Sequence, residues 1–139
     1  MPREDKQPII LYEDNHILAA VKAPGILSQE DASGKPDMVN LLKKYLVMSR
    51  NKPGKAWLGL LHRLDQPASG VMVFALTSKA ASRMSAEFRE NQIDKYYLAL
   101  VNGMPDKPAA VLTDYLSLTK ENGKYHISSK EQGRLASLE

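Results

Sequence analysis

The chain has 139 residues, of which 43% are hydrophobic and 25% charged, a composition that predicts one small globular domain. It contains no cysteine, which excludes disulfide frameworks, thiolate zinc sites and cysteine nucleophiles, and its net charge is a mild +3. The sequence has neither an apolar run of membrane-spanning length nor a signal peptide, so we expect a soluble, cytoplasmic protein.

The first expected elements follow a polar tail, residues 1–8. Apolar runs at Ile9–Tyr12 and Ile17–Val21 predict two strands joined by a polar turn. The next segment, Lys22–Gly25, predicts a type II turn, because proline presets φ and glycine accepts a positive φ. Pro36 is expected in the first turn of a helix. The buried stripe of that helix is predicted to be Met38, Leu41, Leu42, Tyr45 and Leu46.

The middle of the chain predicts two strands and a second helix. Apolar runs at Leu58–Leu64 and Gly70–Leu76 predict the strands, the latter covered on both faces. Thr77 or Ser78 is expected to cap the helix that follows. The buried stripe of this helix is predicted to be Ala80, Ala81, Met84 and Phe88.

The last third of the chain predicts further strands. They are expected at Tyr96–Val101 and Leu112–Leu118, and Asn122-Gly123 predicts a hairpin turn towards Tyr125–Ser128. The stretch Ser128–Glu139 is polar and shows no closing element. Several strands with two helices and a hairpin predict an α+β fold, with a mixed, mainly antiparallel sheet flanked by helices.

One polar segment, HRLDQPASG from residue 62 to residue 70, interrupts the apolar runs. It places a carboxylate at the end of a predicted strand, before a proline-containing turn, where rigid scaffolds often present reactive groups. In a regular strand Arg63 and Asp65 share one face, whereas His62 and Leu64 share the other. From these residues alone, a turn-capping role for Asp65 or a pairing with Arg63 is the commoner interpretation.

The longer string HRLDQPASGVMVFA resembles the HRLDxxTSG or HRLDxxxSG signature of the RluA family of pseudouridine synthases. Two further segments are similar to that family in the right order. Ile17–Gln29 looks like a strand running into a Lys-Pro-Gly-type turn, and Asp94–Gly103 looks like the K-x-Y-x-A-x-V-x-G strand. The resemblance implies a pseudouridine-synthase-like fold in which residues 9–139 are the N-terminal portion of a catalytic domain. It also implies a ribosomal or transfer RNA substrate, and no cofactor or metal.

The resemblance assigns roles residue by residue. Asp65 matches the catalytic aspartate, which acts as nucleophile or acid/base while uracil is detached, turned and rejoined through carbon 5. Tyr97 matches the tyrosine that packs on the uracil, a role suited to an aromatic ring beside a flipped base. Arg63 matches an arginine that fills the space left by the flipped nucleotide in some members. Lys52 and Lys55 become expected phosphate contacts.

Two features depart from the family pattern. Pro67 and Ala68 stand where many members carry Asp-Thr, although Ser69-Gly70 is kept. The later GRxHQIR-like motif, expected to supply a basic partner for the aspartate, is absent, and Gly133-Arg134-Leu135 agrees in two letters only. We therefore expect the chain to be incomplete at its C-terminus and to have weak or no activity alone, because an isolated carboxylate in a cleft tends towards neutrality.

Other chemistries fit the residues less well. A protein-kinase loop needs its aspartate directly after the arginine, together with further motifs that the sequence lacks. The three histidines are far apart, which disfavours a metal site, and His62 is expected to hydrogen-bond to backbone. A glycosidase needs two carboxylates, and Asp65 has no evident second. The remaining alternative is an RNA-binding fragment of the same scaffold that cannot turn over.

Overall fold

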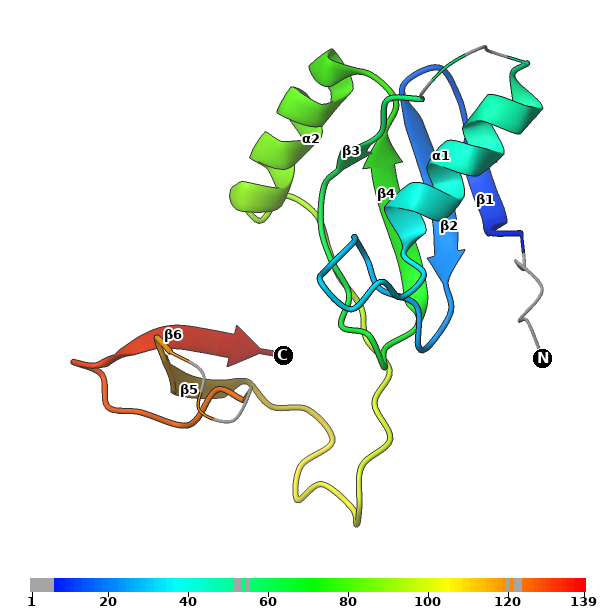
Figure 1. The fold of residues 1–139 in the computed structure, drawn as a ribbon. Helices are drawn as coiled ribbons and strands as arrows, with labels where there is room; N and C mark the ends of the chain where they lie inside the picture. The colour runs from blue at the N-terminus through cyan, green and yellow to red at the C-terminus, as the bar shows by residue number, and fades with distance from the viewer. Residues whose placement is uncertain (1–6, 52–53, 55, 120, 122–123) are drawn as a thin grey trace. The chain divides into compact units, whose positions relative to one another are not determined.

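The computed structural model describes residues 7–51, 54, 56–119, 121 and 124–139. The chain divides into two compact units, residues 1–96 and 97–139. The first unit carries a four-stranded sheet with two helices, and the second is built on a two-stranded sheet (Figure 1). Every strand pair in these sheets is antiparallel. The predicted α+β fold, with mainly antiparallel sheet flanked by helices, is therefore confirmed.

The sheet of the first unit has the strand order β1-β2-β4-β3. Its strands are β1 (Ile9–Glu13), β2 (Ile17–Lys22), β3 (Gly59–Leu60) and β4 (Gly70–Ala75). β1 and β2 form the predicted hairpin. Asp14 closes its turn, because the Asp14 Oδ1 accepts hydrogen bonds from the N–H groups of His16 at 2.6 Å and Ile17 at 2.7 Å. A short acidic side chain at this position holds the turn through its own backbone neighbours.

One face of this sheet packs against helix α1 (Met38–Ser49) to form the core. Alternate residues of β2 point to this face, and Leu18 lies opposite Phe74 of β4 while Ala20 lies opposite Met72. All four side chains are fully buried. Lys22, next in the same alternation, is also fully buried. The helix contributes the buried residues Met38, Leu42 and Leu46.

Helix α1 begins at Met38, two residues after Pro36. Its N-cap is Asp37, whose Oδ1 accepts a hydrogen bond from the Asn40 N–H at 3.0 Å. Pro36 therefore precedes the helix, and the expectation that it occupies the first turn is wrong. A carboxylate cap satisfies an N–H group that proline cannot, which explains why the boundary follows Asp37. In the predicted stripe, Leu41 and Tyr45 are half-buried at the edges of the buried row.

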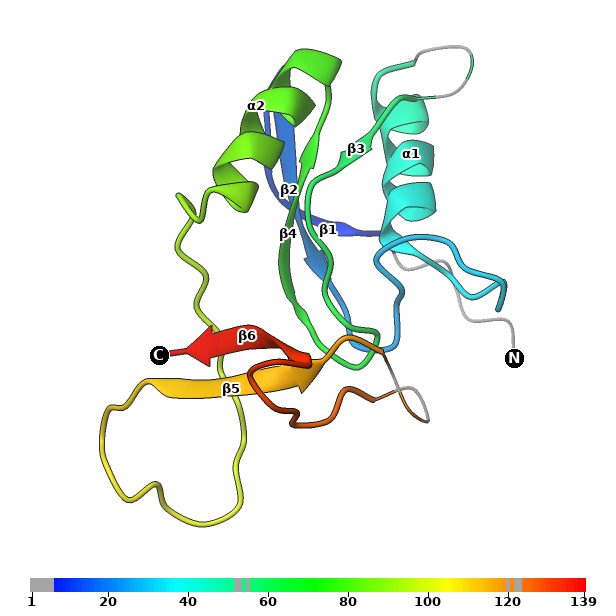
Figure 2. The same ribbon diagram turned by 90° about the vertical axis from the view of Figure 1, so that its left-hand side faces the viewer.

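Helix α2 (Ser78–Arg89) lies on the opposite side of the sheet from α1 (Figure 2). Thr77 is its N-cap, as predicted, and accepts a hydrogen bond from the Ala80 N–H at 3.1 Å. None of its side chains is fully buried, so the predicted stripe is only partly covered. Val71 of β4 is 53% exposed on this side. On this face burial increases from exposed Val71 to half-buried Val73 and buried Ala75, so the expectation that β4 is covered on both faces is wrong for the first part of the strand.

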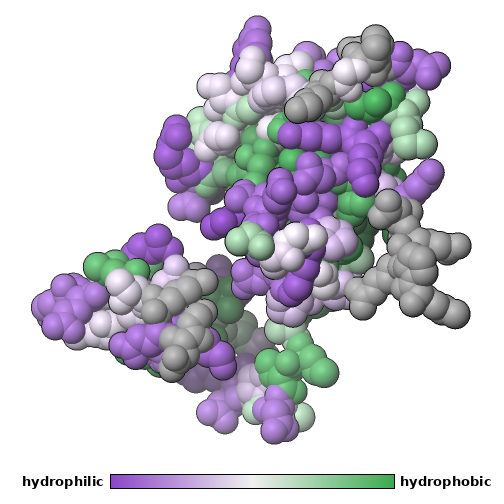
Figure 3. Space-filling model, viewed as in Figure 1, coloured by the Kyte–Doolittle hydropathy of each residue, from purple (hydrophilic) through white to green (hydrophobic). Residues whose placement is uncertain are grey.

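Two predicted strands are shorter than expected or do not form. The run Leu58–Leu64 is a strand only at Gly59–Leu60. Tyr96–Val101 is in no strand among the described residues, and its Leu98 and Leu100 are completely exposed. Hydrophobic side chains lie at the surface along this part of the chain (Figure 3). Alternation favours a strand only when a neighbouring strand accepts its backbone hydrogen bonds, and this segment has no such neighbour in the described structure.

The second unit pairs β5 (Leu112–Ser117) with β6 (Gly133–Leu138) in an antiparallel register. β5 confirms the predicted strand, whereas the expectation that Ser128–Glu139 has no closing element is wrong. Asn122-Gly123 of the predicted hairpin turn lies outside the described residues. Tyr125–Ser128 is not a strand and makes one isolated bridge.

None of the helices in the described part of the chain is both long and apolar enough to cross a membrane.

Candidate functional site

The Asp65 turn comes directly before β4. The Asp65 carbonyl accepts a hydrogen bond from the Ala68 N–H at 3.0 Å, which closes a reverse turn over residues 65–68. The side chains of Arg63 and Asp65 are exposed, whereas His62 and Leu64 are half-buried. This alternation of exposure is as predicted. The strand expected to produce it is not, since residues 61–65 have no strand structure.

The turn after β2 holds the Asp65 turn from one side. Gly25 has the positive φ, +87°, that the predicted type II turn requires. Its N–H donates a hydrogen bond to the Gln66 carbonyl at 2.8 Å, and the Gln66 Nε2 donates to the Gly25 carbonyl at 3.2 Å. Two turns that are far apart in the sequence are thereby joined by a reciprocal pair of hydrogen bonds.

Lys22 places a buried cation beneath the Asp65 turn. Its Nζ donates hydrogen bonds to the carbonyls of Ala68 at 2.6 Å, Gln66 at 3.1 Å and Ala23 at 3.3 Å. Burial lowers the pKa of the Lys22 ammonium, and the negative charge of Asp65 partly offsets this effect. Lys22 is thus a cation whose charge acts on Asp65, although the described structure shows no ion pair between the two side chains. The absence of the basic partner from the later family motif stays a prediction. Lys22 stands in the segment that resembles the Lys-Pro-Gly-type turn of the family, but the sequence alone did not predict that its side chain is buried.

Ser28 holds the residue immediately before Asp65. Its hydroxyl donates a hydrogen bond to the Leu64 carbonyl at 2.6 Å and accepts one from the Leu64 N–H at 3.0 Å. Ser28 is only 6% exposed, so both bonds are shielded from water. The role of Ser28 was not predictable from the sequence, because a serine in a polar loop is typical of an ordinary turn.

His62 joins the segment before the Asp65 turn to the middle of β4. Its Nε2 accepts a hydrogen bond from the Val73 N–H at 3.0 Å, and its ring stacks on Phe88 of α2 with a centroid separation of 4.9 Å. The predicted bond to backbone is thus confirmed. An accepting Nε2 carries no proton, so the ring is neutral in this geometry. Burial, together with the positive charge of Lys95, lowers the pKa of His62.

The lowered pKa of His62 predicts a loss of stability in mild acid. Below about pH 6.5, the ordinary histidine pKa, the unfolded chain takes up a proton that the folded chain resists, so the free energy of unfolding falls. His62→Gln is expected to make the free energy of unfolding less dependent on pH between about 7.5 and 5.5, measured by urea denaturation. His126→Gln, at an exposed site, is the control. Identical pH dependence in wild type and His62→Gln would contradict this assignment.

The structure brings only some of the other predicted site residues near Asp65. Arg63 and Asp65 lie two residues apart on the same exposed segment. Tyr97, 64% exposed, belongs to the second unit, so the structure does not join it to them. Lys52 and Lys55 lie outside the described residues. Within the described ranges, no three His, Asp or Glu side chains gather as ligands of a metal ion would.

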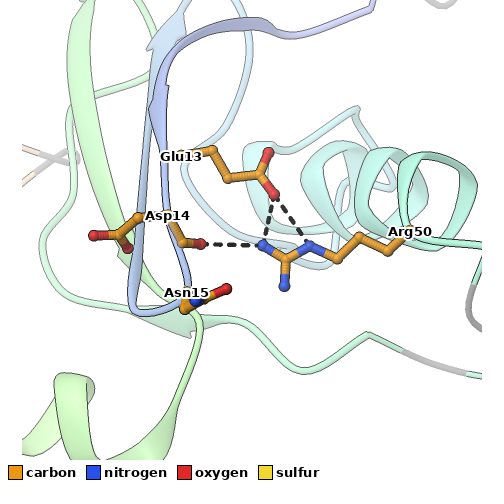
Figure 4. Close-up of a pocket in the computed structure, with 4 residues that line it drawn as sticks. All are labelled: Glu13, Asp14, Asn15 and Arg50. Atoms are coloured by element: carbon orange, nitrogen blue, oxygen red, sulfur yellow. Dashed lines mark hydrogen bonds and ion pairs between the residues drawn. The ribbon is translucent and has the colours of Figure 1, made fainter.

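A pocket at the other end of β2 is lined by Glu13, Asp14, Asn15 and Arg50 (Figure 4). Arg50 donates to the Glu13 Oε1 from Nε at 3.1 Å and from Nη2 at 2.6 Å, and to the Asp14 carbonyl at 3.2 Å. These contacts tie the end of α1 to the β1–β2 turn. None of the residues matched to the family motif lies here, so we assign the pocket a structural role.

Residues 16–138 match the profile of a family described as RNA pseudouridylate synthase. The match extends well beyond Gly103, where the resemblance in the sequence analysis ends. It therefore includes β5 and β6 in full.

Individual relatives agree with the family match. The chain is 31% identical over 134 residues to the ribosomal large subunit pseudouridine synthase D of Borreliella burgdorferi, covering 94% of this chain and 41% of that protein. It is 36% identical over 113 residues to the dual-specificity RNA pseudouridine synthase RluA of Escherichia coli, covering 81% of this chain and 48% of that protein. The chain thus spans less than half the length of these curated relatives.

Solved structures of similar fold include two human proteins. The human RNA pseudouridylate synthase domain containing 4 matches with a TM-score of 0.74 and 22% identity, covering 93% of this chain and 51% of that chain. The human RNA pseudouridylate synthase domain containing 1 matches with a TM-score of 0.67 and 21% identity, covering 99% of this chain and 51% of that chain. At this identity the likeness concerns the fold.

Proposed function

Because the chain belongs to the RNA pseudouridylate synthase family, we propose that it isomerises uridine to pseudouridine in structured RNA, with Asp65 as the catalytic carboxylate. The names of relatives include enzymes of ribosomal large subunit RNA and of transfer RNA. Either RNA class is therefore a substrate candidate. In this proposal residues 9–139 are the N-terminal portion of the catalytic domain, the protein is located in the cytoplasm, and turnover by this chain alone is weak.

The chemistry of this isomerisation suits a single carboxylate. The bond between N1 of uracil and C1′ of ribose breaks, and a bond between C5 and C1′ forms. The proton on C5 leaves and N1 gains a proton, so no atom is added and nothing is oxidised. A carboxylate serves such a reaction as nucleophile or as acid/base, without requiring a cofactor.

One observation supports the assignment most strongly. Asp65 is exposed, while the backbone on both sides of it is held by shielded hydrogen bonds from Ser28 and Lys22. An exposed reactive group on a rigid base is the arrangement expected of a preorganised catalytic side chain. A carboxylate that only capped a turn would accept hydrogen bonds from nearby backbone N–H groups, as Asp14 does.

Further residues take supporting roles in this proposal. Arg63, exposed two residues before Asp65, fills the space that the flipped nucleotide leaves in the RNA. Tyr97 offers an exposed aromatic ring on which the flipped uracil stacks. Lys52 and Lys55 contact RNA phosphates, which makes binding dependent on salt concentration.

The test measures catalysis and the natural modification site separately. Purified chain is incubated with RNA that contains uridine tritiated at C5, and tritium release is counted while RNA binding is measured by filter retention. In parallel, mass spectrometry of RNA from a strain lacking the gene identifies a missing pseudouridine. Tritium release and a missing pseudouridine support the proposal. Binding without tritium release, in a strain with unchanged RNA, would instead support the RNA-binding fragment.

A further inference from the structure

We propose that the loop Lys22–Ser28 is a positioning clamp for Asp65, in which Ser28 fixes the residue before the carboxylate and Lys22 fixes the residues after it. The inference rests on the proposed function of Asp65. Lys22 and Ser28 are positioning residues, because they are 0% and 6% exposed and act through the backbone of the turn.

Ser28 fixes the backbone immediately before Asp65. Leu64 lies outside any strand, so its N–H and carbonyl have no ladder partner, and the one hydroxyl of Ser28 satisfies both. The Leu64 carbonyl belongs to the peptide plane that leads into Asp65. The Leu64 N–H belongs to the preceding peptide plane, so Ser28 fixes both planes around Leu64 and thereby restricts the direction in which the Asp65 side chain leaves the backbone.

Lys22 fixes the backbone that follows Asp65. The carbonyls of Gln66 and Ala68 converge on its Nζ, at 3.1 Å and 2.6 Å. Lys22 itself lies on β2, opposite Gly70 at the start of β4. The turn is thus held between two paired strands by one ammonium group, whose charge also attracts the Asp65 carboxylate.

Neither anchor holds the turn at both ends. Ser28 contacts only Leu64 in this region, while the two turn carbonyls bound by Lys22 follow Asp65. Removing one anchor therefore leaves the other in place, and the fold core on β2 and β4 is not opened. The expected result is a misplaced carboxylate on a folded chain, and displacement of a reacting group by about 1 Å lowers turnover by about 10²-fold.

The test compares Ser28→Ala and Lys22→Met with matched variants. Ser28→Thr keeps a hydroxyl as donor and acceptor, and Lys22→Arg keeps a buried cation with several N–H donors. Ser33→Ala removes a hydroxyl from an exposed site in the following loop and is the control. We expect Ser28→Ala and Lys22→Met to lower kcat for tritium release by about 10²-fold with KM and RNA binding within about twofold of wild type. Ser28→Thr is expected to recover most of kcat, and Ser33→Ala to leave it unchanged.

Amide hydrogen exchange of each variant gives a readout independent of activity. In Ser28→Ala the Leu64 amide is expected to exchange at least about tenfold faster, as loss of one shielded hydrogen bond implies, while core amides of β2 and β4 stay protected. Unchanged exchange at Leu64, or exchange raised throughout the core, would overturn the clamp. If wild-type chain releases no tritium and RNA from the deletion strain is unchanged, the proposed function fails, yet this exchange pattern still decides whether the clamp exists. Equal kcat in wild type and Ser28→Ala would overturn its role in positioning.

Discussion

Replacing Asp65 with asparagine is expected to lower kcat for pseudouridine formation by about 10³-fold, with RNA binding little changed. Asparagine has nearly the same shape as aspartate but cannot act as an anionic nucleophile or exchange a proton. The Asp65 side chain is exposed and the turn is held through backbone groups, so the substitution leaves the fold intact. Tritium release from RNA labelled at C5 of uridine measures the rate, and filter retention measures binding.

A matched control separates the loss of this carboxylate from the loss of any negative charge. Glu87→Gln removes an exposed carboxylate on α2 and is expected to keep the wild-type rate. The same Asp65 substitution made in the chromosomal gene is expected to abolish the modification that a gene deletion abolishes. A kcat for Asp65→Asn within about tenfold of wild type would contradict the catalytic role, because acid/base or covalent catalysis contributes far more.

Replacing Phe74 with alanine is expected to lower the free energy of unfolding by about 3–5 kcal/mol. Phe74 is fully buried on β4, opposite Leu18 of β2, and belongs to the core that α1 covers. A small domain has a total stability of about 5–15 kcal/mol, so this single change removes a large part of it. Urea denaturation followed by far-ultraviolet circular dichroism measures the difference.

The control for Phe74→Ala lies on the other side of the same strand. Val71 is 53% exposed, and Val71→Ala is expected to cost less than about 1 kcal/mol. Equal losses in the two variants would show that the face near α2 is packed as tightly as the face near α1. Turnover of Phe74→Ala is also expected to fall by about half at its unfolding midpoint, because half of the molecules are then unfolded and β4 begins at Gly70 next to the Asp65 turn.

Secondary structure was predictable where the hydrophobic pattern is local. The short apolar run Ile17–Val21 predicts β2, and the helical spacing from Met38 to Leu46 predicts α1, because both patterns lie within one continuous segment. Tyr96–Val101 has an equally strong pattern but forms no strand, since a strand needs hydrogen bonds from another segment. Gly133–Leu138 has a weak pattern but forms β6, since β5 supplies those bonds.

The residues of the candidate site likewise fall into two groups, those that a local pattern identified and those that it did not. Asp65 was identifiable because it stands in a short contiguous motif, and His62 because a buried histidine beside a strand usually bonds to backbone. Ser28 and Lys22 were not identifiable, since their partners lie 36 to 46 residues away in the sequence. Such roles depend on how two loops meet, which no periodicity or turn preference describes.

The position of Lys22 makes the geometry of the Asp65 turn sensitive to an inserted or deleted residue in β2. Leu18, Ala20 and Lys22 share one side of that strand, so the spacing that fills the interior also delivers the ammonium to the turn. Inserting a single residue between Ala20 and Lys22 would rotate the lysine to the opposite side of the sheet while leaving Leu18 and Ala20 in place. The hydrophobic residues of this strand can therefore be replaced by others of different size, whereas the number of residues between Leu18 and Lys22 has to stay the same.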